Sequence, residues 1–474
     1  MATDGLSTVR RFAGPGVATL AVAAGLWWGH RSGGLGLALT AVAAGAAAFA
    51  ISAQRSRADG PRRTNRPTTT PGVGSAAAGV LTAVVVWNLT SMLVQAVPDN
   101  GDRFASRVAT WGRDHGYGPV IDRLEAWAYR TPPSKDPAQD LGLAPVASVV
   151  PTATPTTTPG TTPVTTASPV TTAPSSTAPV STAPVTTVPV PSAPPALQPV
   201  FDPPLPGEGQ WVPVALAGGQ EAMWATSLRP LADTGGVVAT MVTIDQTHLR
   251  AGLFNGSELP GGRWQRGNFV PKVLRPALVA AMNGGFRFDH MLGGYKTEGV
   301  EVKPLRDGDA TLAVGRDGRL VLGRLGRDLF DDGTWLSLRQ NLMLMVDDGT
   351  SQVQQAIREG VWWGADKGNA VYVKRSAVCE LTDGRLAYVL ADPVDAGQFA
   401  RSMIAMGCRK AIQMDINVDW PLFTTFSHDT GQPVPHFVDR RMTGNPRRSL
   451  DGSSKDFFAF FDATLVTPGS VLEA

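Results

Sequence analysis

Residues 283–286 (NGGF) and residues 415–420 (DINVDW) are the two stretches that decide which fold this sequence predicts. The first closes a short apolar run, and its glycines let the backbone turn or approach another group closely. In the second, strand periodicity would place Asp415, Asn417 and Asp419 on one face. Two carboxylates and an amide on one face are unusual for a core strand, so the pattern predicts the floor of a polar ligand site.

Each stretch also has a simpler interpretation. Asn283-Gly284 alone is a common hairpin-turn signal, because both residues tolerate positive φ. The face of residues 415–419 could point into water, or its oxygens could hold a calcium ion. The EF-hand pattern is absent, since neither its glycine nor its distal glutamate stands at the required spacing. We therefore predict no metal and no cofactor, with a divalent cation such as calcium as an open alternative.

Further landmarks follow in a definite order from about residue 237 onward. They are strand-like runs over 237–245 and up to 256, the NGGF stretch, a hairpin turned at Asp317-Gly318, the run 339–349, a hairpin that starts at 374–378 and turns at Asp383-Gly384, and a helical stretch over 396–406 leading to Asp415. This succession resembles the phosphodiester glycosidase family over roughly the last 240 residues. The namesake of that family removes N-acetylglucosamine from a sugar-1-phosphodiester.

The resemblance implies roles for particular side chains. It implies catalysis by Asp415 and substrate binding by Asn283, Gly284, Gly285 and Arg375. The face shared with Asp415 adds Asp419 as a catalytic partner and Asn417 as a substrate-binding residue. The planar fork of Arg375 suits a phosphate, although a structural salt bridge is the alternative. The family usually has Asp-Gly-Gly-Gly-Ser where this chain has residues 415–419 (DINVD). Asp415 matches, but Ile416 and Val418 stand in place of glycines, so the glycine loop is missing.

The chemistry of this reaction sets what such a site must contain. A phosphate ester is a weakly basic leaving group, so the main task is to stabilise an oxocarbenium-like transition state and direct a nucleophile, which a carboxylate can do. Further acid candidates are His428, His436, Glu298 and Glu301, with structural or surface roles as the alternative. The sequence thus predicts a hydrolase of a sugar-1-phosphodiester in an envelope glycan. A catalytically inactive glycan-binding or scaffold module on the same fold is the second hypothesis.

The amino-terminal part predicts a membrane domain within residues 1–98. Only 17% of the 474 residues are charged, and long runs lack any charge. Runs over 12–30, 33–54 and 73–97 approach the roughly 20 residues that span a bilayer. A cleaved signal peptide or alanine-rich soluble helices are the alternatives. The fold class expected for the whole chain is therefore α+β, with mixed sheets and helices in the carboxyl-terminal domain after three transmembrane helices and a disordered linker.

Charge and composition predict the location. Five arginines lie between residues 55 and 66 against one aspartate, and basic loops stay cytoplasmic. Three crossings would then place the rest outside the cell membrane, in contact with lipid and an envelope glycan. A net charge of +2 excludes nucleic acid as an expected partner.

The remaining segments predict the domain boundaries. Residues 99–145 form a polar juxtamembrane segment, and residues 146–200 are rich in Pro and Thr without charge, which favours an extended linker. The glycosidase-like domain is expected over 201–474. Its two cysteines, Cys379 and Cys408, could form a disulfide across adjacent strands in an oxidising compartment, or remain buried thiols.

Overall fold

The structure, a computed structural model, describes residues 84–95, 104–144, 193–289, 291–363, 371–466 and 469–473. The predicted spans over 12–30 and 33–54 lie outside the described residues, as does most of the Pro/Thr-rich run. The chain divides into two units, residues 1–121 and residues 122–474.

The predicted fold class is corrected in its amino-terminal part. The third predicted span, 73–97, is described only over residues 84–95, which form a helix. Across the described ranges, no helix is both long enough and apolar enough to span a membrane. The expectation of three transmembrane helices ahead of the sheets is therefore wrong for the fold that the structure describes.

The first unit contains the helix over 84–95 and α4 (Phe104–Asp114), and α5 (Gly118–Ala128) crosses into the second unit. Trp111 joins the first two helices, because its indole Nε1 donates a hydrogen bond of 3.0 Å to Ser91 Oγ. The ring of Trp111 also stacks on His115 at 4.6 Å between centroids. These contacts make one small aromatic cluster.

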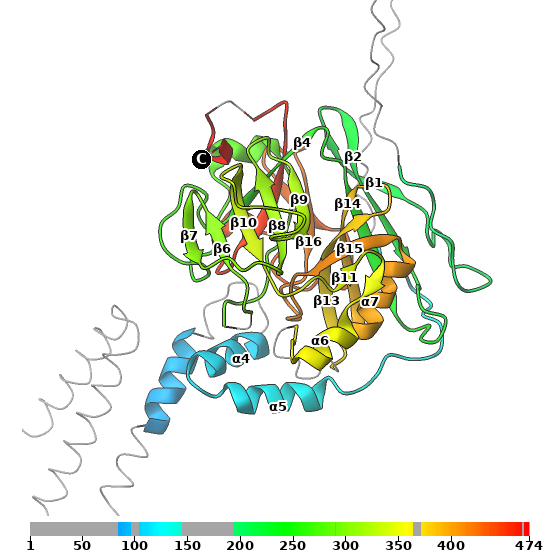
Figure 1. Cartoon of the computed structure of the whole chain (residues 1–474), viewed down its shortest axis with the longest axis horizontal. Helices are drawn as coiled ribbons and strands as arrows, with labels where there is room; N and C mark the ends of the chain where they lie inside the picture. Colours follow the sequence, from blue (N-terminus) through cyan, green and yellow to red (C-terminus); the bar gives the residue numbers. More distant parts are fainter. Residues whose placement is uncertain are drawn as a thin grey trace, which may run out of the picture. The chain divides into compact units, whose positions relative to one another are not determined.

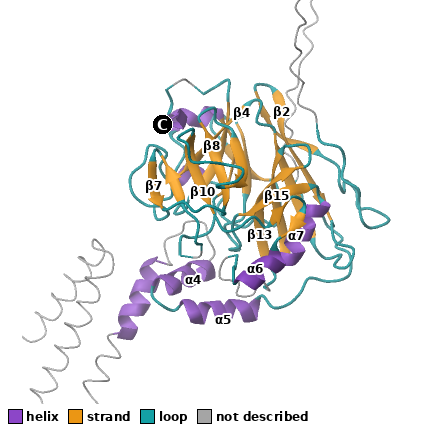
Figure 2. Ribbon diagram, in the orientation of Figure 1, coloured by secondary structure: helices purple, strands orange, loops and turns teal. Residues whose placement is uncertain are grey.

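The second unit consists mainly of three sheets, with few helices (Figure 2). The eight-stranded sheet has the order β1 (Val212–Ala217), β2 (Gln220–Leu228), β3 (Val238–Ile244), β14 (Leu386–Val394), β13 (Val373–Leu381), β15 (Cys408–Gln413), β11 (Val346–Asp347) and β12 (Thr350–Ser351). A five-stranded sheet has the order β7 (Val300–Lys303), β6 (Tyr295–Thr297), β10 (Trp335–Gln340), β8 (Ala310–Gly315) and β9 (Leu320–Arg324). The other has β17 (Val434–Phe437), β16 (Phe423–Ser427), β5 (Leu278–Asn283), β18 (Phe457–Asp462) and β4 (Leu249–Phe254). Neighbouring named strands pair antiparallel.

Helices cover one face of the eight-stranded sheet. In Figure 1, α6 (Val353–Glu359) and α7 (Ala396–Ala405) lie beside β11, β13 and β15. Alternate residues of β13, such as Ala377 and Cys379, pack with Phe399 of α7 in one apolar cluster. Val378 points the other way, into the cluster shared with the five-stranded sheets. The middle of the eight-stranded sheet is therefore buried on both faces.

Short helices complete this unit. They are the 3₁₀ turns η2 (Lys272–Ala277) and η3 (Val471–Glu473) and the single α-helical turn α8 (Arg448–Asp451). Helix α7 has the strongest local signal, because Asp395 and Gln398 form a reciprocal capping box at its start. Both predicted hairpins are present: β8 pairs with β9 around Gly318, and β13 pairs with β14 around Gly384. Each of these glycines has a positive φ.

Candidate functional site

Asn283 ends β5, the central strand of its sheet, and its side chain joins three parts of the domain. The Tyr388 hydroxyl and the Leu422 amide donate to Asn283 Oδ1, each at 3.1 Å. Asn283 Nδ2 donates to Ser376 Oγ at 3.1 Å and to the Gly284 carbonyl at 2.8 Å. Burial raises the pKa of Tyr388, so its hydroxyl stays protonated and can donate. The amide thus uses its whole hydrogen-bonding capacity on the protein.

Gly284 and Gly285 are required by close packing rather than by a turn. A Cβ on Gly284 would lie 2.2 Å from Asp456 Oδ2, and one on Gly285 would lie 2.3 Å from Asn341 Oδ1. Neither glycine is among the described residues with positive φ. The hairpin-turn interpretation of Asn283-Gly284 is therefore wrong. The two glycines instead let the backbone after β5 approach the side chains of Asp456 and Asn341 closely.

The stretch 415–420 is a loop and not the alternating strand that the sequence predicted. Strand β15 ends at Gln413, two residues before Asp415. Asp415 Oδ1 accepts hydrogen bonds from the amides of Ile416 and Asn417, at 2.7 and 3.0 Å. Asn417 Oδ1 accepts from the Asp419 amide at 3.1 Å. These short side chains bind their own backbone, so the loop replaces a strand ladder with two local turns.

Asp415 and Lys455 form a buried ion pair. Lys455 Nζ lies 2.9 Å from Asp415 Oδ2, and both side chains are almost inaccessible to solvent. Burial lowers the pKa of the Lys455 ammonium, and the Asp415 carboxylate opposes that shift. The backbone around Asp415 is also fixed, because its amide donates to Ser376 Oγ and its carbonyl accepts from the Ser376 amide. Since Ser376 also binds Asn283, the structure does bring Asn283 and Asp415 together.

Two cations face the ring of Trp420. The Arg448 guanidinium carbon lies 3.8 Å from the ring centroid, and Lys455 Nζ lies 4.2 Å from it. Arg448 Nη2 also donates to the carbonyl of Asp419 at 3.1 Å. The Asp419 side chain accepts from Thr443 Oγ1 at 3.3 Å and is fully buried. The loop therefore positions an aromatic ring against two positive charges.

Arg375 does not join this cluster, contrary to the predicted convergence of the site residues. It shares a strand face with Ala377 and Cys379, which pack in the helix-covered cluster, whereas Ser376 faces Asn283. Its guanidinium donates to the carbonyls of Val394 and Val371 and to the side chain of Gln413. Because β13 is buried on both faces, a fully buried Arg375 serves the packing of this sheet.

A second buried ion pair completes the cluster. Arg339 Nε lies 2.8 Å from Asp456 Oδ2, and both side chains are at most 1% exposed. Asp456 directly follows Lys455, and its carbonyl accepts from the Gly284 amide at 3.0 Å. Arg339 Nη2 also donates to the carbonyl of Phe286. The NGGF stretch is therefore clamped between the segment that starts β18 and the end of β10.

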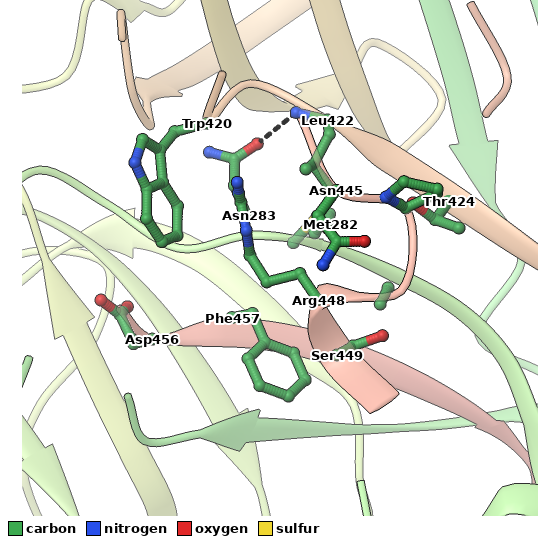
Figure 3. A pocket seen from close by; sticks show the side chains of 12 residues that line it. Met282, Asn283, Trp420, Leu422, Thr424, Asn445, Arg448, Ser449, Asp456 and Phe457 are labelled. Atoms are coloured by element: carbon green, nitrogen blue, oxygen red, sulfur yellow. Dashed lines mark hydrogen bonds between the residues drawn. The ribbon is translucent and has the colours of Figure 1, made fainter. Parts of the chain in front are cut away.

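A pocket lies over this cluster (Figure 3). Its enclosed volume is about 20 Å³, roughly the space of one water molecule, and the open space around it brings the total to about 300 Å³. It is lined by Ala281, Met282, Asn283, Trp420, Leu422, Thr424, Asn445, Pro446, Arg448, Ser449, Asp456 and Phe457. Ile416 and Val418 do not line it. The pocket thus combines an aromatic ring, a cation, a carboxylate and several neutral polar groups.

Two hydroxyls that line the pocket are unsatisfied. Thr424 Oγ1 and Ser449 Oγ are buried, and neither has a hydrogen-bond partner in the described part of the chain. An unsatisfied buried hydroxyl is destabilising, so a water molecule or another polar group in the pocket would stabilise both hydroxyls.

The other acid candidates lie elsewhere. His428 Nε2 is 2.8 Å from the carbonyl of Leu278, at the opposite end of β5 from Asn283. His436 Nε2 is 2.9 Å from Ser427 Oγ. Glu298 accepts from two backbone amides, those of Gln265 and Arg266. Across the described residues, no group of three or more His, Cys, Asp or Glu side chains could hold a metal ion.

The structure also joins Cys379 of β13 to Cys408 of β15 by a disulfide, with 5.7 Å between their Cα atoms. The two strands are neighbours in the eight-stranded sheet. The bridge thus fixes β15, which leads to Asp415, against β13, which carries Ser376.

Comparisons with known proteins find only a distant resemblance in fold. No protein family and no curated protein matches the sequence. The chain is similar to the catalytic domain of zebrafish N-acetylglucosamine-1-phosphodiester alpha-N-acetylglucosaminidase, auto-inhibited by its pro-peptide, at 16% identity and a TM-score of 0.36, over 52% of this chain and 86% of that one. It is also similar to a hypothetical protein from Synechocystis (13% identity, TM-score 0.35, 53% and 64% covered). A third is a putative exported protein from Burkholderia pseudomallei (11%, TM-score 0.25, 49% and 75% covered).

The charged residues that precede β18 were not predicted from the sequence as site residues. Arg448, Lys455 and Asp456 stand just before the continuous apolar run 457–461. A charged pair at the start of such a strand mirrors the polar Asn283 at the end of β5, and Phe457 pairs with Asn283. In the sequence, the available signal was a charged pair directly before a continuous apolar run.

Proposed function

We propose that the carboxyl-terminal domain binds a sugar-1-phosphodiester of a cell-envelope glycan and hydrolyses the bond between the sugar and the phosphate. One observation carries the proposal: the pocket places the Arg448 cation and the Asp456 carboxylate beside the unsatisfied hydroxyls of Thr424 and Ser449. A phosphorylated sugar needs this combination, since it presents one anion and several hydroxyl groups.

Binding would use the positive and the neutral groups separately. The planar guanidinium of Arg448 suits two phosphate oxygens. Its carbonyl partner on Asp419 and the ring of Trp420 hold it in place. The hydroxyls of Thr424 and Ser449 would then hydrogen-bond to the sugar. In this proposal Asp419 positions Arg448 and does not touch the ligand.

Hydrolysis would break the bond from the anomeric carbon to the phosphate oxygen. The bonding electrons leave with the phosphate ester, which needs little protonation, and positive charge develops on the sugar. Water then bonds to the anomeric carbon and gives up a proton. The Asp456 carboxylate, whose Oδ2 lies 2.8 Å from Arg339 Nε, would stabilise the developing charge and accept that proton. Asp415 would act through Lys455, whose ammonium lies against Trp420.

The disulfide supports a site outside the cytoplasm. Disulfides such as Cys379–Cys408 persist in oxidising compartments and are rare in reducing ones. An envelope glycan is the substrate class that such a compartment supplies.

The test is to incubate the purified chain with a panel of sugar-1-phosphodiesters and to measure the release of free sugar. We expect release from at least one member, and loss of that release in Arg448→Met. If no member of the panel either binds or is cleaved, the proposal is wrong.

A second function, glycan binding without hydrolysis, is favoured by one specific observation. Both oxygens of Asp415 are already engaged, Oδ1 by two backbone amides and Oδ2 by Lys455. A carboxylate held this way has little freedom to act as a nucleophile. Calorimetric binding of a panel member without any release of sugar would select this function over hydrolysis.

A further inference from the structure

We infer that residues 134–144, here termed the strap, are an integral part of the carboxyl-terminal domain, so that the segment before the Pro/Thr-rich run and the end of that run are both attached to it. The sequence alone had placed the strap in a separate polar segment and started the domain at residue 201. Both the strap and the domain belong to the same unit of the structure.

The first half of the strap binds the connection between β2 and β3. The Gly236 amide donates to the Ser134 carbonyl at 2.9 Å, and the Gly235 amide donates to the Lys135 carbonyl at 3.1 Å. In return, the Ala138 amide donates to the Gly235 carbonyl at 2.9 Å. Three backbone hydrogen bonds therefore fix residues 134–138 to this connection.

The two glycines make this contact sterically possible. A Cβ on Gly235 would lie 2.7 Å from the Cα of Pro137. A Cβ on Gly236 would lie 2.7 Å from the Ser134 carbonyl oxygen. Neither glycine has a positive φ, so the turn itself does not demand them. Their lack of a side chain therefore serves the strap.

The second half of the strap binds the segment after β17. The Arg440 amide donates to the Gly142 carbonyl at 2.8 Å, and the Ala144 amide donates to the Val438 carbonyl at 3.0 Å. Leu143 packs against the main apolar cluster between the sheets. The strap thus contacts two loops that are about 200 residues apart in sequence, those around Gly236 and Arg440.

A buried arginine connects the strap to the interior. Arg229 Nη1 donates to the Ala138 carbonyl at 3.2 Å, while Nη2 lies 2.6 Å from Glu208 Oε2. Both Arg229 and Glu208 are buried. Hydrogen bonding to Arg229 holds the pKa of Glu208 below its usual range, against the effect of burial. Removing the strap would therefore leave a buried cation short of one acceptor.

The carboxyl-terminal end of the Pro/Thr-rich run is bonded to the same domain. The Leu197 amide donates to the Gly209 carbonyl at 2.9 Å, and Trp211 Nε1 donates to the Pro195 carbonyl at 3.0 Å. Residues before the run and residues at its end are therefore bonded to one folded unit. It follows that cutting the run will not release the domain from the residues that precede it.

The test uses the full chain with a site-specific protease sequence substituted within residues 160–170. After complete cleavage, we expect both fragments to elute together in native size-exclusion chromatography and to separate only in denaturant. Separation under native conditions would overturn the inference.

Matched variants show whether the strap is the attachment. In the cleaved chain, the double variant Gly235→Ala/Gly236→Ala should release the amino-terminal fragment. Gly267→Ala is the control, because a Cβ there would lie 3.7 Å from its nearest neighbour, the carbonyl oxygen of Trp264. Release by the control, or retention by the double variant, would contradict the strap as the cause.

A second measurement applies if the double variant does not fold. Hydrogen exchange in the cleaved wild-type chain should leave the amides of Gly236, Arg440 and Ala144 protected, as in the uncut chain. Loss of protection at all three after cleavage would show that the strap leaves the domain, and would overturn the inference. Neither measurement depends on whether the pocket binds or cleaves a sugar phosphodiester.

Discussion

Replacing Thr424 by valine is expected to stabilise the domain and to weaken ligand binding at the same time. The Thr424 side chain is only 1% exposed, and its hydroxyl has no hydrogen-bond partner in the described part of the chain. Burying such a group costs about 1–3 kcal/mol. Valine has nearly the same shape without the hydroxyl, so the free energy of unfolding should rise by about 1 kcal/mol. For a domain of this size that is a rise of roughly 2 °C in Tm.

The ligand should respond in the opposite direction. A neutral hydrogen bond contributes about 0.5–1.5 kcal/mol, which corresponds to a roughly 2- to 10-fold weaker Kd for the sugar phosphodiester. Calorimetric unfolding measures the first effect, and titration calorimetry measures the second on the same samples.

Thr226→Val is the matched control. Thr226 lies in β2 and does not line the pocket, and its hydroxyl is likewise buried without a partner among the described residues. This variant should gain a similar stability and leave Kd unchanged. A destabilised Thr424→Val, or an equal loss of affinity in both variants, would refute the reasoning.

Three further outcomes are expected. Arg448→Lys should weaken phosphodiester binding roughly tenfold, because lysine lacks the planar fork, whereas Arg447→Lys, at an exposed arginine, should not change it; equal titration curves would contradict the role of Arg448. Asp415→Asn leaves the Lys455 ammonium buried without its carboxylate, so urea unfolding should show a loss of about 3–5 kcal/mol, and a loss below about 1 kcal/mol would argue against the pair. Burial raises the pKa of Asp309 to about 6, so the folded state holds a proton that the unfolded state releases, and stability should fall as the pH rises from about 4 to about 6. Asp309→Asn should remove that fall, which Tm values at both ends of the range would show.

The parts of the fold that the sequence predicted correctly are those with strong local signals. The hairpins at Gly318 and Gly384 need positive φ, and glycine adopts it without strain. Helix α7 begins at a capping box that Asp395 and Gln398 form within one turn. In each case the residues that decide the structure are near neighbours in sequence.

The loop over 415–420 shows how the same kind of reasoning failed. Its alternation of polar and apolar residues has the period of a strand. However, Asp415 and Asn417 bind the backbone just after themselves, and this competes with strand pairing. The alternating pattern cannot distinguish a paired strand from a loop of local turns, because short polar side chains occur in both.

The candidate site was predicted only in part, since its pairings span long distances in sequence. Asn283 and Asp415 do meet, through Ser376. Arg375 was misplaced because both faces of β13 are buried, so the sequence contains no signal for the face on which it lies. The pairing of Arg339 with Asp456 joins residues 117 positions apart, and nothing local in either segment predicts it.

The packing of Asn283 against Gly284 has a consequence for how the protein ages. An Asn-Gly dipeptide in a flexible chain deamidates readily, because the glycine nitrogen attacks the asparagine amide carbon to form a succinimide. Here the Gly284 nitrogen is engaged with the Asp456 carbonyl, and the Asn283 amide is held by Tyr388 and Leu422. The attack geometry is therefore blocked while the domain is folded. Isoaspartate at position 283 in stored protein would thus mark the molecules that have unfolded.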